Sequence, residues 1–130
     1  MAKDTATLRS EAGKVRHLGS ARSGTSHNAH MRLTSIALIP LTIAFAVMVL
    51  TLVTKDYNQV RAYLGHPIPA VLMLLFLGCG IYHMQLGMRT IIEDYVHGHM
   101  IKEWSLIANL FFCCAIGLAC IYAVLRIGFA

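Results

Sequence analysis

The stretch PAVLMLLFLGCGIYHMQLGMRTII, residues 69–92, decides the fold of this 130-residue chain. A helix needs about 20 consecutive apolar residues to cross a bilayer, and this run of 24 residues is long enough. Two further apolar runs of similar length lie at about 33–54 and about 104–127. The pattern predicts an all-α integral membrane protein with three transmembrane helices at these positions.

The overall composition supports a membrane protein. Hydrophobic residues make up 57% of the chain and charged residues 13%, whereas soluble domains carry about 25% charged residues. The net charge of +5 does not indicate a nucleic-acid partner, because six of the eleven Lys and Arg residues lie in the first 32 positions. By the positive-inside rule, this cluster predicts an inner N-terminus and an outer C-terminus. The chain then divides into a polar arm on the inner side, residues 1–31, and a three-helix membrane domain, residues 32–130.

A histidine, His83, lies in the middle of the second apolar run, eleven residues before the pair Asp94 and Tyr95. On a helix this spacing returns to within about 20° of the same face and advances about 16 Å along the axis. An ionisable group at this depth is costly and requires a partner or a ligand. Neutral imidazole is a common axial ligand of haem iron, and Gly80 and Gly87 leave space beside it. A hydrogen bond to a neighbouring helix is the alternative role.

The other polar residues near the inner side also have two possible roles each. Arg32 is suited to clamping an anionic group such as a haem propionate, or it extends its charge toward the interface; the same alternatives hold for Arg89. Asp94 and Tyr95 either end the helix or contact a partner, because acidic residues at a helix C-terminus oppose the helix dipole. His97 and His99 alone are weak evidence for a metal site. These two and the earlier residues His17 and His27 are expected to be solvated.

Three stretches of the sequence resemble one family. The spacing of His83, Gly87 and Met88, followed by Asp94 and Tyr95, is similar to the second helix of the small hydrophobic membrane anchor of succinate dehydrogenase (respiratory complex II). The start of the first helix resembles that family as well, and the upstream stretch resembles its alphaproteobacterial branch. The residues that carry these two likenesses are Arg32, Thr34, Ile36, Ala37 and Leu38, and Leu18, Gly19, Ser20, Ala21, Gly24 and Thr25. The resemblance extends from about residue 15 to the end.

The resemblance implies a subunit that catalyses nothing alone. It implies partners: a flavoprotein subunit with FAD, an iron–sulfur subunit, and a second anchor subunit that supplies the other haem histidine and completes a helical bundle around haem b. His83 would then be the axial ligand of the haem iron and Arg32 a propionate partner. Tyr95 would hydrogen-bond ubiquinone, with Asp94 in support. The complex would pass electrons from succinate to ubiquinone, linking the tricarboxylic acid cycle to the respiratory chain. The expected location is the bacterial inner membrane, or the mitochondrial inner membrane.

Two other functions stay open at this point. A haemless anchor or assembly subunit of a related fumarate reductase would use His83 only for packing. A small transporter subunit belongs to a different class of protein, and it should show broken helices or internal repeats, of which the sequence has no sign.

Overall fold

Residues 22–129 are described by the computed structural model of this chain, and within them every regular element is a helix. The helices are α2 (Arg22–Leu52), α3 (Tyr57–Gly65), α4 (Pro67–Tyr95) and α5 (His99–Phe129). Three of them, α2, α4 and α5, are long and apolar enough to cross a membrane. The predicted all-α fold with three membrane helices is confirmed. The orientation of the termini stays a prediction, and residues 1–21 of the predicted arm lie outside the described part.

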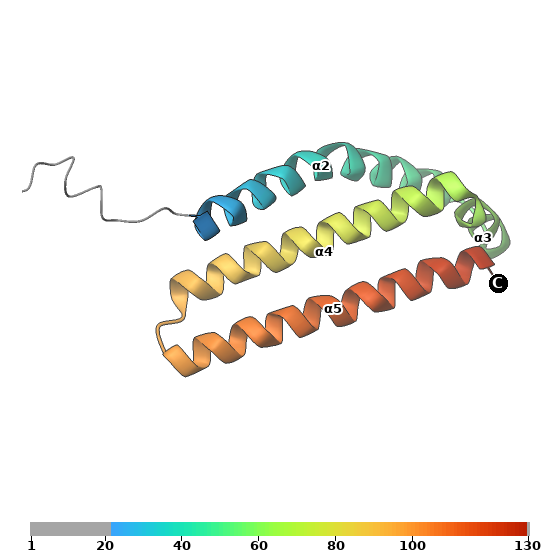
Figure 1. The fold of residues 1–130 in the computed structure, drawn as a ribbon. Coiled ribbons are helices and arrows are strands. Elements are labelled where there is room, and N and C mark those ends of the chain that lie inside the picture. Colours follow the sequence, from blue (N-terminus) through green and yellow to red (C-terminus); the bar gives the residue numbers. More distant parts are fainter. Residues whose placement is uncertain (1–21, 130) are drawn as a thin grey trace, which may run out of the picture.

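Helix α2 begins at Arg22, well before the predicted start near residue 33. Hydropathy marks only the part of a helix that lies in hydrocarbon, and helical hydrogen bonds continue equally well through polar residues. The 31 residues of α2 span about 46 Å, more than the hydrocarbon core of about 30 Å. Arg32 therefore lies inside α2 and does not open it. The helix also continues through Pro40, and it is bowed in Figure 1.

The connection between the first two apolar runs contains the short helix α3. Its N-cap is Asp56, whose Oδ1 accepts a hydrogen bond from the backbone N–H of Gln59 at 3.0 Å. A new helix, α4, then begins directly at Pro67. Proline suits this first position, because its fixed φ is helical and the N–H that it lacks has no intrahelical partner there.

Helix α4 lies between α2 and α5, and α3 crosses the end of the bundle where the chain ends (Figure 1). On the α2 side, Phe45 stacks on Phe76 with ring centroids 4.4 Å apart. Few residues are buried within the chain: the apolar ones are Met48, Leu86, Ile92 and Cys113. Large apolar side chains such as Leu50 and Phe111 are about 70% exposed. Such extensive apolar surface requires lipid or other subunits to cover it.

Candidate functional site

The imidazole of His83 is held against α2 by Thr34. His83 is half-buried, and its Nδ1 lies 2.9 Å from the Oγ1 of Thr34. The same hydroxyl lies 2.9 Å from the carbonyl oxygen of His30 and 3.0 Å from that of Met31. A hydroxyl has one proton, and carbonyl oxygens only accept, so Thr34 bonds α2 and His83 together when it donates to α2 and accepts from the Nδ1–H of His83. This network favours the tautomer with the proton on Nδ1, in which Nε2 keeps a free lone pair.

The two glycines near His83 have different roles. A Cβ at Gly87 would meet no atom within 4 Å, so the space one turn from His83 is open, as expected. A Cβ at Gly80 would lie 3.9 Å from Cδ2 of Leu38, so this glycine faces α2. Small residues at such positions let membrane helices approach closely. Gly80 therefore lies in the interface between α2 and α4, where an added methyl group would make an ordinary van der Waals contact.

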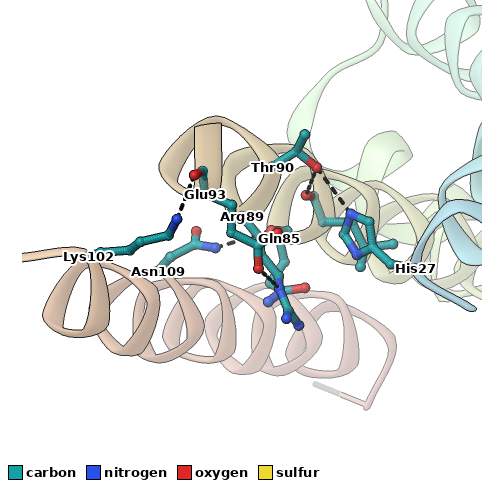
Figure 2. Close-up of polar contacts among 8 residues, drawn as sticks. His27, Gln85, Arg89, Thr90, Glu93, Lys102 and Asn109 are labelled. Atoms are coloured by element: carbon teal, nitrogen blue, oxygen red, sulfur yellow. Dashed lines mark hydrogen bonds and ion pairs between the residues drawn. The ribbon is translucent and has the colours of Figure 1, made fainter. Parts of the chain in front are cut away.

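Two histidines of α2 also contact hydroxyl groups of α4. Nε2 of His27 lies 3.0 Å from the Oγ1 of Thr90 (Figure 2), and Nδ1 of His30 lies 2.6 Å from the hydroxyl of Tyr82. We call this row of contacts the histidine seam; its members are His27, His30 and Thr34 of α2 and Tyr82, His83 and Thr90 of α4. The prediction that His27 is a solvated loop residue is wrong. The spacings of three and four residues from His27 to His30 to Thr34 place them on one helical face, and this was the signal that the sequence interpretation missed.

The C-terminal end of α4 is neutralised by two cations. Arg89 forms an ion pair with Glu93, with Nε and Oε1 2.7 Å apart, and both side chains are partly exposed. Nζ of Lys102 on α5 donates to the backbone carbonyl oxygen of Glu93 at 2.6 Å (Figure 2). A cation at a helix C-terminus interacts favourably with the dipole. These contacts offset the local conflict created by the acidic residues there and give Arg89 a partner within the chain.

The remaining predicted site residues are not brought against His83. Arg32 is exposed on α2, and it lies two residues, or about 200° around the helix, from Thr34, which faces α4. Asp94 and Tyr95 are exposed in the last turn of α4, and Tyr95 is 77% exposed. Within residues 22–129 the side chains of these three residues form no hydrogen bond. A site built on them needs groups from outside this chain.

Among the described residues, no group of three or more His, Cys, Asp and Glu side chains is arranged to hold a metal ion. His97 instead contacts the carbonyl oxygen of Tyr95, with Nδ1 3.0 Å away. A haem iron makes a smaller demand on the protein, because the porphyrin supplies four ligands and the chain only an axial one. The single imidazole of His83, with its free Nε2, fits that requirement.

Comparison with known proteins then decides the family. A family model described as succinate dehydrogenase/fumarate reductase transmembrane subunit matches residues 7–123. The chain belongs to this family. It is 36% identical to the succinate dehydrogenase hydrophobic membrane anchor subunit of Paracoccus denitrificans, over 85% of each chain. It is 32% identical to the subunit of the same name from Rickettsia conorii, over 82% of this chain and 85% of that one. No solved structure matches the chain.

Membership of this family agrees with the three membrane-spanning helices and confirms the resemblance inferred from the motifs around His83 and Asp94. As a member of an anchor family, the protein is a multi-pass membrane protein. The sequence interpretation also quoted Thr34 as part of the resemblance, but it gave this residue no role. Its role depends on a contact between residues 49 positions apart, which no local pattern reveals.

Proposed function

We propose that this chain is a membrane-anchor subunit of succinate dehydrogenase that ligates haem b through His83 and contributes to a ubiquinone site through Tyr95 and Asp94. Family membership supports the anchor role. One observation carries the haem proposal, namely the contact of 2.9 Å between Nδ1 of His83 and Oγ1 of Thr34. A hydrogen bond at one ring nitrogen orients an imidazole and makes the other nitrogen a stronger ligand.

In this proposal the haem supplies a one-electron carrier within the membrane. His83 would hold the haem iron through Nε2, and a second anchor subunit would supply the other protein ligand. Thr34 would hold the imidazole in its tautomer and orientation. The open space beside Gly87 would accommodate the edge of the porphyrin. Arg32 is exposed, and its planar guanidinium suits a bidentate contact with a propionate carboxylate.

The quinone proposal rests on the exposed end of α4. The hydroxyl of Tyr95 donates a hydrogen bond to a ubiquinone carbonyl oxygen, and Asp94 orients this hydroxyl or passes on a proton. Reduction to the quinol consumes two electrons and two protons. The exposed carboxyl group of Asp94 can pass protons from water to the quinone. An iron–sulfur subunit delivers the electrons, and a flavoprotein subunit with FAD oxidises succinate. We infer that this end of α4 lies at the inner face of a bacterial inner membrane.

The haem proposal is tested by a reduced-minus-oxidised visible spectrum of the detergent-purified complex, isolated through a tag on this chain. We expect a b-type band in the wild type and its loss in His83→Leu. The matched control is His30→Leu, which removes an exposed histidine of the same seam and is expected to keep the band. No band in the wild type would favour a haemless anchor. A band that survives His83→Leu would mean that the iron is held elsewhere.

The quinone proposal has a separate test. Tyr95→Phe removes one hydrogen bond and should lower succinate:ubiquinone reductase activity about tenfold. Succinate oxidation with a water-soluble artificial acceptor should be unchanged, because that reaction does not need the quinone site. The control is Tyr63→Phe, on α3 at the other end of the bundle. Equal quinone reductase activity in Tyr95→Phe and the wild type would contradict the assignment.

A further inference from the structure

A polar pocket lies between α3 and the last turns of α5. Figure 1 shows that this end of the bundle is opposite the end at which α4 finishes. The pocket has a volume of about 580 Å³ and lies between α3 and α5, which pack together. Two tyrosines and two arginines form its polar walls, and two apolar residues complete it: Tyr57, Arg61, Tyr122, Arg126, Ala123 and Ile127. Neither the family comparison nor the proposed haem and quinone sites give these residues a role.

The polar walls are two copies of one arrangement. Tyr57 and Arg61 are four residues apart on α3, and Tyr122 and Arg126 are four residues apart on α5. Residues four apart lie on the same face of a helix, one turn above the other. Because the two helices are in contact, the two Tyr–Arg pairs line a single pocket.

The charge of the pocket indicates an anionic ligand. Within residues 22–129, neither Arg61 nor Arg126 forms an ion pair with an acidic side chain. Asp56 is the only acidic residue in the segments 53–68 and 122–128, and its Oδ1 is engaged in capping α3. Guanidinium groups bind phosphate oxygens through paired N–H donors. Two arginines without an acidic side-chain partner among residues 22–129 therefore favour a phosphate group.

The neighbouring surface indicates that this ligand also has an apolar part. A smaller pocket of about 100 Å³ is lined only by apolar residues, namely Leu64, Met73, Ala123, Val124 and Ile127. It shares Ala123 and Ile127 with the polar pocket, so the two lie next to each other. Tyrosines are typical of the depth at which lipid headgroups lie. An anionic head beside an apolar groove at this depth is the chemistry of a phospholipid.

We propose that this double pocket binds an anionic glycerophospholipid, with its phosphate between Arg61 and Arg126 and an acyl chain along Val124 and Met73. Inorganic phosphate shares the chemistry of the head but not of the tail. The lipid contacts α3 and α5 together, and so it joins the short helix to the last membrane helix.

Native mass spectrometry of the purified complex tests this proposal. The complex is exposed to phosphatidylglycerol, or to phosphatidylcholine with the same acyl chains, and the bound lipid is counted. We expect a preference for phosphatidylglycerol that falls about fivefold in Arg61→Gln or Arg126→Gln and about 30-fold in the double variant. The matched control is Lys55→Gln, which removes a charge at the same end from a residue that does not line the pocket. This control should behave as the wild type.

A second variant separates a lipid from a free anion. Ala123→Phe fills the junction of the two pockets and should abolish retention of phosphatidylglycerol, although both arginines remain. Millimolar inorganic phosphate should not displace the lipid from the wild type. The proposal is overturned if the double arginine variant retains phosphatidylglycerol like the wild type, or if phosphatidylcholine binds equally well. It is also overturned if phosphate alone displaces the lipid, which would indicate a site for free anions.

Discussion

Helix α4 meets α2 and α5 through different kinds of polar contact. On the α2 side, the histidine seam consists of side chains bonded to side chains, and a histidine takes part in each pair. One weaker contact to the backbone accompanies the seam, from Sγ of Cys79 to the carbonyl oxygen of Thr34 at 3.6 Å. On the α5 side, side chains bond to the backbone of α4: Nδ2 of Asn109 donates to the carbonyl oxygen of Gln85 at 3.1 Å, and Lys102 donates to that of Glu93 (Figure 2). The first interface therefore depends on imidazole rings, and the second on an amide and an ammonium group that donate to backbone carbonyl oxygens.

The difference indicates which interface serves the proposed chemistry. Asn109 is buried, and its Oδ1 accepts a hydrogen bond from Sγ of Cys113, so its polar atoms are used within the chain. In the α2 interface, by contrast, His83 keeps Nε2 free after Nδ1 is bonded to Thr34. A contact that is complete within the chain contributes to stability, whereas a contact that leaves a lone pair available prepares a ligand. We therefore expect changes at the two interfaces to have separable effects.

The largest effect is expected for Thr34→Val, which keeps the shape of the side chain and removes the hydroxyl. His83 then loses its acceptor, and removal of such a supporting contact weakens metal affinity about 10- to 100-fold. The measurement is haem per complex after purification, determined from the reduced-minus-oxidised spectrum. Thr34→Ser restores an acceptor and should restore most of the haem. Full haem content in Thr34→Val would show that the contact does not support the ligand.

A smaller effect is expected for Asn109→Leu in the other interface. The variant loses one interhelical hydrogen bond, which in membrane proteins contributes about 0.6 kcal/mol on average and about 1.7 kcal/mol at most. The thermal unfolding midpoint of the complex should fall by a few degrees, while haem per complex stays at the wild-type level. Loss of haem at unchanged thermal stability would reverse the roles that we assign to the two interfaces.

Lys102→Gln should have the smallest effect of the three. It removes the cation that bonds the Glu93 carbonyl at the end of α4, a contribution of about 0.3–1 kcal/mol for a partly exposed group. Thermal unfolding at low and high salt measures it, because screening weakens the interaction with the helix dipole. The difference between variant and wild type should shrink as salt is added. A difference independent of salt would point to the hydrogen bond alone.

The three membrane helices were predictable because the bilayer imposes a length and a composition that hydropathy detects directly. The short helix α3 is polar, so hydropathy does not detect it. A local signal was present, since Asp56 followed three residues later by Gln59 is the pattern of a helix N-terminus. The start of α2 at Arg22 was missed for a related reason, because the helix begins outside the apolar run.

The site was predictable in part. His83 was found because an ionisable residue in a membrane segment is costly, and this argument needs no tertiary information. The contacts of His27, His30 and Thr34 join residues 63, 52 and 49 positions apart. Such contacts depend on how α2 is rotated and shifted against α4, which the pattern along either helix does not determine. The roles of Arg32, Asp94 and Tyr95 stay predictions, since their proposed partners belong to other molecules.

The most direct test of the contrast between the two interfaces is a redox titration of the haem in Thr34→Val and Asn109→Leu, side by side with the wild type. Loss of the acceptor at Nδ1 makes the imidazole a weaker donor and favours reduced iron. We predict that Thr34→Val raises the midpoint potential on the order of 40 mV, equivalent to a hydrogen bond of about 1 kcal/mol. Asn109→Leu should leave the potential unchanged. Equal shifts in both variants, or none in Thr34→Val, would contradict the account.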